Sequence, residues 1–425
     1  MLILDSTQVS QMMNISQPLT LPNQQVIKNR IAKAAMEENM ASNSRNPSQA
    51  IFNLYQAWSE GGTGLIITGN VMVDANAMTG PGGIVLDKHS DLSTFKHWAQ
   101  VAQQNNTQCW MQINHPGRQV PKDVNETALA PSAIKMNLGE FTARFANPVA
   151  MTQEDIERVI EQFTTTAKLA EQSGFRGVEV HAAHGYLLSQ FLSPLSNQRE
   201  DQWGGSLDNR ARLLLEIIKN IKAQTQSDFA VAVKLNTADF QKGGFSEADA
   251  LYVIQALEAL NVDLIELSGG SYEAPAMQGQ SRDGRTLARE AYFLELVESM
   301  VNKVSVPLMI TGGIRRLAIA EQVISSGIAM AGMATALAID PSLTNKWIKH
   351  LNEQASAALK PITWKNKTLA SVANMAQVRM QLRRLSKGKS TQPNRPYWLS
   401  LIQDQLANKK NIKAYKAHMA KRDLV

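Results

Sequence analysis

The sequence of 425 residues contains a single cysteine, Cys109, and only 7 histidines. One thiol excludes a disulfide framework, a zinc site of four cysteines and an iron–sulfur cluster held by thiolates. Because Cys109 lies in an apolar run, we interpret it as a core residue of a cytoplasmic protein. The chain also lacks an apolar run of about 18 residues, so we expect no transmembrane helix. Its N-terminus lacks the basic and apolar regions of a signal peptide.

Acidic residues are scarce at the C-terminal end of the chain. Residues 346–425 hold 17 lysines and arginines but only 3 aspartates and glutamates, a net charge of +14, so the rest carries −8 of the total of +6. The basic residues are spread between apolar ones, which argues against nucleic acid or a membrane surface as the partner. We expect this segment to dock on the acidic body or on a neighbouring subunit, and we assign it to contacts in a homo-oligomer.

Two glycine-rich nucleotide motifs are also absent. Neither a P-loop nor a Rossmann GxGxxG occurs, and the glycines cluster as pairs such as Gly312-Gly313. A bound NAD(P)H is therefore not expected to have a domain of its own.

Short apolar, β-branched runs alternate with amphipathic helical stretches from about residue 26 to residue 340. Eight runs predict strands, at 30–35, 64–73, 108–114, 177–181, 229–235, 264–268, 307–311 and 328–333. Seven stretches predict helices, at 47–60, 92–105, 153–172, 208–225, 247–260, 289–302 and 317–326. Eight strands are the number that a closed (β/α)8 barrel needs, and near-continuous hydrophobicity is typical of parallel strands covered on both faces. We therefore predict an α/β fold, a (β/α)8 TIM barrel over 19–345, between an N-terminal extension (1–18) and a helical C-terminal extension (346–425).

Two inserts and the C-terminal extension add to this barrel. Residues 115–150 and 185–209 are long connections after strands, and such loops lie on the catalytic face of a barrel. In the extension, an apolar stripe at Met375, Val378, Leu382 and Leu385 predicts one helix, 386–396 a flexible turn, and 398–420 a final helix.

Two histidines stand at the end of the fourth predicted strand, in VEVHAAHGY (178–186). Side chains at C-terminal strand ends point into the active site of a barrel. His181 and His184 are compatible with three roles: core residues, metal ligands together with a carboxylate, or two N–H donors that converge on one substrate oxygen. We expect Glu179 on the opposite side of the strand, which weakens the metal alternative. Tyr186 is either a packed phenol or a proton donor.

The segment VEVHAAHGYLLSQFLSPLSNQREDQWGGSLDNRARLLLEII (178–218) resembles the signature of the Old Yellow Enzyme family of FMN-dependent NAD(P)H oxidoreductases. Five further segments are similar and in the same order: KNRIAKAAM (28–36), GGTGLIIT (61–68), MQINHPGR (111–118), VKLNTADF (233–240) and ITGGI (310–314). The resemblance runs from about residue 19 to residue 343.

This resemblance implies that FMN passes hydride from NADH or NADPH to a small molecule with an activated C=C bond, such as an enone, enal or nitroalkene. Some family members instead oxidise amines. His181 and His184 would bind the substrate oxygen and the nicotinamide carboxamide, and Tyr186 would donate the proton. Gln112 would bind the flavin pyrimidine edge and Lys234 would lie near flavin N1 and O2. The remaining expected FMN contacts are Ala35, Met36, Glu37 and Asn70 at the ring, and Gly312, Gly313, Ala334 and Thr335 at the phosphate.

Glu37 is a departure from the family, which usually has threonine or cysteine at this position. A carboxylate would then stand near flavin O4 and N5. If ionised, it would disfavour negative charge on the reduced flavin and lower the flavin potential; if protonated, it could replace the lost donor. We hypothesise that Glu37 tunes the substrate or the potential.

Two basic positions also depart from the family. Lys234 replaces an arginine, which keeps the charge but loses the bidentate fork. Ala334-Thr335 replaces Gly-Arg, so FMN would bind less tightly, or Arg315 or Arg316 would supply the missing cation. Two other classes stay open: a metal-dependent lyase or aldolase on the same barrel, and a flavin-binding protein without reductase activity.

Overall fold

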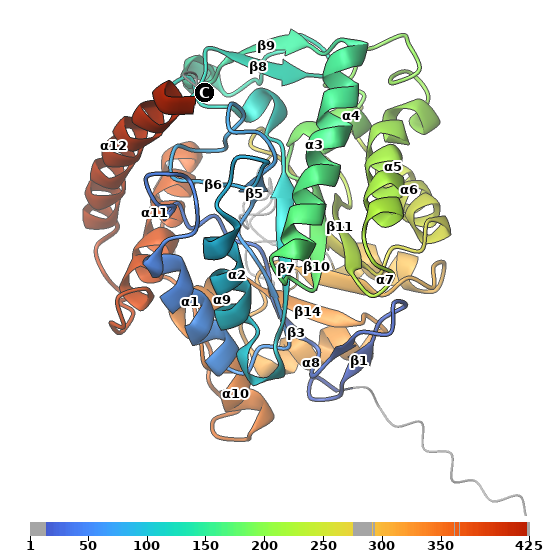
Figure 1. Cartoon of the computed structure of the whole chain (residues 1–425). Helices are drawn as coiled ribbons and strands as arrows, with labels where there is room; N and C mark the ends of the chain where they lie inside the picture. Colours follow the sequence, from blue (N-terminus) through green and yellow to red (C-terminus); the bar gives the residue numbers. More distant parts are fainter. Residues whose placement is uncertain (1–13, 275–290, 292–293, 361, 365, 423–425) are drawn as a thin grey trace, which may run out of the picture.

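The structure is a computed structural model that describes residues 14–274, 291, 294–360, 362–364 and 366–422 (Figure 1). Eight parallel strands close into a barrel, which confirms the predicted (β/α)8 fold. Around the barrel the strands are β3 (Ile31–Lys33), β4 (Leu65–Ile67), β7 (Gln108–Asn114), β10 (Gly177–Ala182), β11 (Ala230–Asn236), β12 (Leu264–Ser268), β13 (Leu308–Thr311) and β14 (Met330–Met333). β14 pairs with β3 and so completes the ring.

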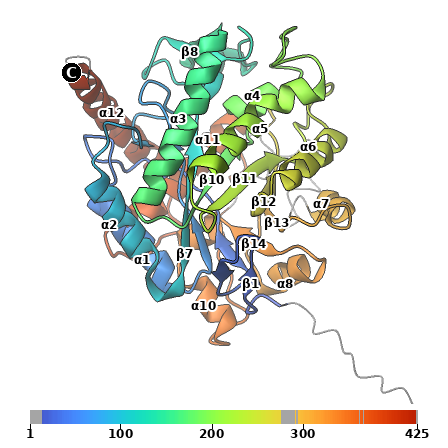
Figure 2. The same ribbon diagram turned by 45° about the vertical axis from the view of Figure 1, so that its right-hand side comes forward.

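Helices surround the strands (Figure 2). They are α1 (Gln49–Glu60), α2 (Leu92–Ala102), α3 (Gln153–Gln172), α5 (Leu207–Gln224), α6 (Glu247–Ala259), α7 (Leu294–Val301), α8 (Leu317–Ser325) and α9 (Thr335–Ile339). Their apolar faces bury the outward side chains of the strands, such as Val178 and Val180. Of the predicted helix 289–302, residues 294–301 are helical, while 289, 290, 292 and 293 lie outside the described residues.

The prediction of one strand over 64–73 is wrong. The segment divides into β4 and a separate β5 (Val71–Met72), which pairs with β7 and with β6 (Ile84–Val85). The division follows from a close backbone approach at Gly69, where an added Cβ would lie 2.0 Å from Glu38 Oε2 and 2.2 Å from the Met36 carbonyl oxygen. Only glycine fits there, and the barrel ladder ends beside it.

Two further element boundaries differ from the prediction. The helix predicted over 92–105 ends at Ala102, because Asn105 and Asn106 adopt left-handed φ angles of 56° in the short turn η1 (Gln104–Asn106). The loop predicted over 185–209 contains α4 (Leu187–Leu192), whose side chains are all buried.

The N-terminal end of the barrel is closed by a short hairpin. β1 (Leu19–Thr20) pairs antiparallel with β2 (Val26–Ile27). Leu19, Leu21 and Ile27 pack with the inward side chains at the bottom of the barrel, including Trp110. Access to the interior is therefore left to the C-terminal ends of the strands, where a barrel carries its chemistry.

The insert at 115–150 forms a small sheet of its own. Within it β8 (Thr127–Ala130) and β9 (Asn147–Ala150) pair in parallel, and η3 (Gly139–Arg144) lies between them in the chain. Figure 1 shows the two strands at the top of the view, where α4 contacts β8.

The C-terminal extension docks on the barrel that precedes it. α10 (Leu343–Ile348) is followed by α11 (Lys367–Leu385), which packs on α1 and α9, and by α12 (Tyr397–Arg422), which packs on α11 (Figure 1). Tyr415 of α12 donates its phenol hydrogen to the Ala75 carbonyl (2.8 Å), and Arg422 pairs with Asp87 (2.8 Å). The C-terminal extension therefore contacts the body of its own chain, and its contacts with a neighbouring subunit stay a prediction.

We predict that Tyr415→Phe lowers the free energy of unfolding by about 1–2 kcal/mol, because it removes a hydrogen bond to a buried carbonyl. Tyr252→Phe is the matched control: its phenol bonds Asp208 on the exposed surface, so the loss should stay within about 0.5 kcal/mol. Urea denaturation of both variants measures the difference. Equal losses would mean that the α12 contact adds no more stability than a surface hydrogen bond.

Candidate active site

Polar side chains form a layer at the C-terminal ends of β7, β10, β11 and β12. Successive side chains of a strand point to opposite faces, so residues two apart share a face. Glu179 and His181 therefore both point into the barrel, and the expectation that Glu179 lies on the opposite side is wrong. The layer contains Gln112, Asn114, Glu179, His181, Lys234 and Glu266, all of them buried.

This layer holds two carboxyl groups in different charge states. Gln112 Nε2 donates to Glu179 Oε1 (2.7 Å), and Lys234 Nζ lies 2.6 Å from Glu266 Oε1. Burial, and then the charge of Glu266, raise the pKa of Glu179 well above its ordinary value. Burial is the largest influence on Glu266 and alone would raise its pKa as well, but Lys234 together with hydrogen bonds from Glu179 and Thr311 outweighs it, and the net shift is downward. Glu179 is therefore neutral and Glu266 is charged, so that the charge of Lys234 is matched.

His181 and His184 lie side by side at the mouth of the barrel, with ring centroids 5.0 Å apart. The Ala183 N–H donates to His181 Nδ1 (3.2 Å), so the proton of a neutral His181 ring is on Nε2. His184 Nε2 lies 2.8 Å from Ser268 Oγ. Burial lowers the pKa of both rings well below 6.5, with the charge of Lys234 acting in the same direction. Both imidazoles are therefore neutral at neutral pH.

A strained turn brings His184 back beside His181. His184 has a left-handed φ of 61°, which is uncommon for a residue with a side chain. Its N–H donates to Asn236 Oδ1 (3.1 Å) and its carbonyl accepts from Gln119 Nε2 (3.0 Å). These two anchors hold a conformation that costs on the order of 1–3 kcal/mol, as is typical of functional sites.

Two phenols adjoin the histidines. The rings of His181 and Tyr186 have centroids 4.8 Å apart, and the hydroxyls of Tyr186 and Tyr272 are 3.1 Å apart. Burial, followed by the neighbouring Tyr272, raises the pKa of Tyr186 well above 10; burial and then Glu37 raise that of Tyr272 to about 12. Both phenols therefore keep their protons. The sequence reasoning missed Tyr272, although it lies just after β12, where the rule on strand ends could have found it.

Glu37 faces donors from two directions at the same mouth. Thr79 Oγ1 donates to Glu37 Oε1 (2.5 Å), and Arg379 Nη2 lies 3.5 Å from Glu37 Oε2. Arg379 belongs to α11 of the C-terminal extension, and its other terminal nitrogen donates to Asp404 of α12 (2.7 Å). No sequence motif pointed to Arg379.

The other predicted FMN contacts lie after the strands or at the start of α9. Ala35 and Met36 precede Glu37, and Asn70 follows β4. Gly312 and Gly313 follow β13, and Gly313 has a left-handed φ of 71°. Ala334 is the N-cap residue of α9 and Thr335 its first residue, while Arg315 and Arg316 are exposed ahead of α8. Contact of these residues with FMN stays a prediction.

The donor set at the mouth fits a flavin. Asn114 is fully buried on the inward face of β7, and neither its amide oxygen nor its amide nitrogen has a hydrogen-bond partner among the described residues. A buried amide without partners is costly and calls for a ligand with both donors and acceptors, as the edge of a flavin has. Gln112 on the same strand and Lys234 two strands away would be neighbouring donors. The sequence reasoning missed Asn114.

The same mouth offers a metal ion few ligands. Among the described residues, no group of three histidine, cysteine, aspartate or glutamate side chains is placed to hold a metal. The neighbours of the two histidines are instead Ser268 and Tyr186.

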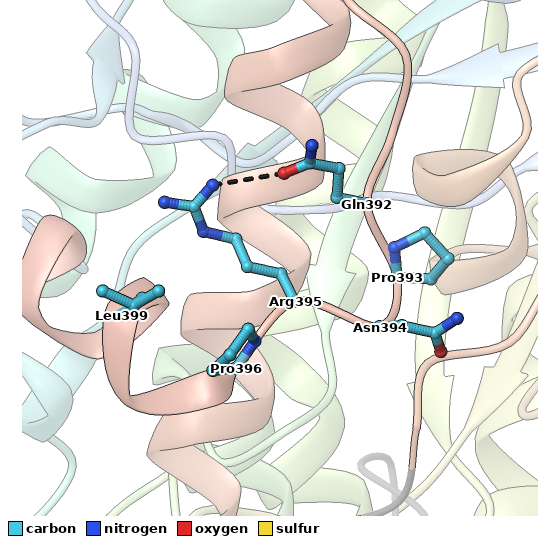
Figure 3. Close-up of a pocket in the computed structure, with 6 residues that line it drawn as sticks. All are labelled: Gln392, Pro393, Asn394, Arg395, Pro396 and Leu399. Carbon is cyan, nitrogen blue, oxygen red and sulfur yellow. Dashed lines mark hydrogen bonds between the residues drawn. The ribbon is translucent and has the colours of Figure 1, made fainter.

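A cavity of about 490 Å³ lies away from this site, in the turn between α11 and α12 (Figure 3). It is lined by Gln392, Pro393, Asn394, Arg395, Pro396 and Leu399, and Arg395 Nη1 donates to Gln392 Oε1 (3.2 Å) at its side. None of the strand-end residues lines it, so we do not assign it to the chemistry.

A second cavity, of about 400 Å³, is formed within the insert at 115–150, whose residues Arg118 and Phe145 are among those that line it. Phe145 and Tyr272 have ring centroids 6.2 Å apart, and Arg118 pairs with Glu273 (2.6 Å). The insert therefore lies against the site, as expected for a long loop after a barrel strand.

The closed barrel and its polar strand ends define a TIM-barrel enzyme. A profile of the NADH:flavin oxidoreductase / NADH oxidase family matches residues 14–354, and the chain belongs to this family of oxidoreductases. The resemblance to the Old Yellow Enzyme family is thereby confirmed.

Relatives and solved structures agree with this assignment. The chain is 37% identical over 356 residues to the NADH-dependent flavin oxidoreductase iliE of Neonectria sp. (strain DH2), covering 78% of this chain but only 46% of that protein. It is 34% identical over 355 residues to the protein of the same name from Hypocrea jecorina (strain QM6a), covering 78% of this chain and 88% of the relative. The old yellow enzyme homologue from Zymomonas mobilis shares the fold, with a TM-score of 0.69, 20% identity, and coverage of 84% of this chain and 99% of that chain.

We predict that His181 and His184 remain neutral at pH 6, where an imidazole with the ordinary pKa of about 6.5 is mostly protonated. Folding lowers both pKa values, so the folded state favours the neutral rings. The stability that depends on the neutral rings is present above pH 6.5 and is lost as the pH falls towards the folded-state pKa. NMR of the ring nitrogens measures the charge state, and the urea-unfolded chain is the control. A protonated ring at pH 6 in the folded protein would contradict the prediction.

Proposed function

We propose that the protein is an FMN-dependent NAD(P)H oxidoreductase that reduces the activated C=C bond of an enone, enal or nitroalkene. Membership of the NADH:flavin oxidoreductase family supports the class of reaction. The observation that carries the substrate class is the pair of neutral imidazoles, His181 and His184, beside the phenol of Tyr186 at the barrel mouth.

FMN, when bound, would supply the redox chemistry, namely hydride transfer between NAD(P)H and the β-carbon of the substrate. The histidines act on the other end of the conjugated system. His181 donates its Nε2–H to the carbonyl or nitro oxygen, and His184 provides the second ring against that oxygen. Negative charge develops on this oxygen as the β-carbon accepts the hydride, so these hydrogen bonds strengthen in the transition state.

Neutral imidazoles suit this task because each can donate without carrying a charge of its own. Burial is the main cause of the lowered pKa of both rings, and the nearby charge of Lys234 lowers the pKa of each ring further. The same two rings would bind the carboxamide of the nicotinamide, so reductant and substrate would occupy one place in turn, with ping-pong kinetics.

Tyr186 would supply the proton that completes the reduction. Its raised pKa keeps the phenol protonated until the α-carbon becomes basic. The Tyr272 hydroxyl, 3.1 Å away, is placed to pass a proton to Tyr186 afterwards. In sum, the C=C bond gains a hydride and a proton, and NAD(P)H becomes NAD(P)+.

The barrel residues would share the binding of FMN. Gln112, Asn114 and Lys234 would be donors to the flavin ring, and Gly312 and Gly313 would offer backbone N–H groups to the phosphate. Lys234 has three N–H donors, so its ion pair with Glu266 leaves donors for the flavin.

We predict that the double variant His181→Ala/His184→Ala keeps bound, yellow FMN but loses at least about 100-fold in enone turnover, as expected for the loss of an oxyanion donor. The double variant His89→Ala/His97→Ala removes two imidazoles elsewhere and should keep wild-type turnover. Steady-state assays with NADH and with NADPH measure both. Retained turnover in the first variant would remove the pair from the mechanism.

Anaerobic reduction separates this function from its rivals. Bleaching of the flavin by NADH or NADPH, with reoxidation by an enone, supports the proposal. Reduction by an amine would indicate the oxidative direction instead, and FMN that neither nicotinamide bleaches would indicate a protein without reductase activity. A colourless protein with stoichiometric zinc would favour the lyase alternative.

The location and the oligomeric state of the enzyme do not follow from the residues of the site. No helix within the described part of the chain has the length and apolar character needed to cross a bilayer. The homo-oligomer, the cytoplasmic location and the limits 19–345 for the FMN-binding unit stay predictions.

A further inference from the structure

The C-terminal extension places one guanidinium at the mouth of the barrel. Arg379 lies in the middle of α11, more than 300 residues after Glu37 in the chain, yet its Nη2 is 3.5 Å from Glu37 Oε2. Only 20% of the Arg379 side chain and 24% of the Glu37 side chain are exposed, so the pair is largely shielded from water and salt.

Arg379 is held in this position by α12. Asp404 lies between two arginines of α11: Oδ2 is 2.7 Å from Arg379 Nη1, and Oδ1 is 2.7 Å from Arg383 Nη2. Burial alone would lower the pKa of Arg379, but Glu37 and then Asp404 outweigh it and raise this pKa, so the guanidinium keeps its charge. Arg383 lies one helical turn further along, where it anchors Asp404, while the ion pair with Glu37 is made by Arg379.

Glu37 lies between a hydroxyl group and a guanidinium group. Thr79 Oγ1 donates at 2.5 Å and Arg379 approaches from the other side. The charge of Glu37 is also felt by the phenols, since Glu37 contributes to the raised pKa of Tyr186 and of Tyr272 while Arg379 opposes it at both. The Glu37–Arg379 pair therefore acts electrostatically on the residue that we assign as the proton donor.

We propose that Arg379 is a positioning residue of the active site, supplied by the C-terminal extension of the same chain, which pairs with the Glu37 carboxylate and cancels its charge. This inference rests on the proposed function, because it concerns the flavin and the phenols of that site. Without Arg379, an unmatched negative charge would stand at the mouth, where it opposes both electron uptake by FMN and proton donation by Tyr186. Removing Glu37 as well would restore neutrality.

A cycle of four proteins tests the proposal: wild type, Arg379→Met, Glu37→Gln and the double variant. We expect Arg379→Met to lower the midpoint potential of bound FMN and to reduce kcat by about tenfold, with a smaller effect on KM. We expect Glu37→Gln to raise the potential. The double variant should return close to the wild-type potential, and thermal unfolding without FMN should show coupling between the two positions.

Arg383→Met is the matched control. It removes a guanidinium from the same helix and the same aspartate, but not the one that faces Glu37. It should lower thermal stability about as much as Arg379→Met and leave the potential and kcat unchanged. Equal potentials in the Arg379→Met and Arg383→Met variants would overturn the proposal.

Two conservative variants apply where Arg379→Met does not fold. Arg379→Lys keeps the charge and should leave the potential near that of wild type, whereas Glu37→Gln, with Arg379 intact, should still raise it. An unchanged potential in Glu37→Gln would overturn the inference. A wild-type protein whose FMN neither NADH nor NADPH reduces would instead contradict the proposed function itself, so the two failures are distinguishable.

Discussion

The register of the parallel strands determines which side chains meet at the mouth of the barrel. Glu179 pairs across the ladder with Gln112, His181 with Lys234, and Lys234 with Glu266. Because these partners share the inward face, a shift of one residue in any strand would send its polar groups outward among the helices. The apolar side chains that alternate with them fix this register, since they are fully buried between the strands and the helices.

Charge matching is the second constraint on the site. Three shielded charges at or near the mouth have an opposite charge close by: Lys234 with Glu266 at 2.6 Å, Arg118 with Glu273 at 2.6 Å, and Glu37 with Arg379 at 3.5 Å. Glu179 needs no opposite charge, because its raised pKa keeps the carboxyl group protonated and neutral. Burial keeps the imidazoles neutral in this environment of matched charges. In the proposed function, these neutral donors would act on a substrate oxygen without competition from an unmatched fixed ion.

The sequence predicts much of the barrel because the relevant signals are local. Apolar runs separated by amphipathic helices gave the number of strands, and the strand-end rule pointed to His181, His184 and Tyr186. The errors have physical causes of other kinds. The strand over 64–73 ends early because Gly69 meets Glu38, a contact between separate segments that no periodicity reports. The position of Glu179 was a mistake in applying the two-residue period of a strand. Arg379 depends on how α11 docks, which the basic charge of the tail indicated only in general terms.

Arg379 reaches the site from a helix outside the barrel, so its position depends on α11 and not on the barrel strands. An α-helix turns by about 100° per residue, so one residue inserted between Asn366 and Arg379 would swing the guanidinium away from Glu37. No barrel strand would change, and the hydride-transfer groups would keep their places. Changes in the segment after the barrel would thus alter the electrostatics at the mouth independently of the strands. An appended pair of helices can in this way change the chemistry of the fold without a substitution in its strands.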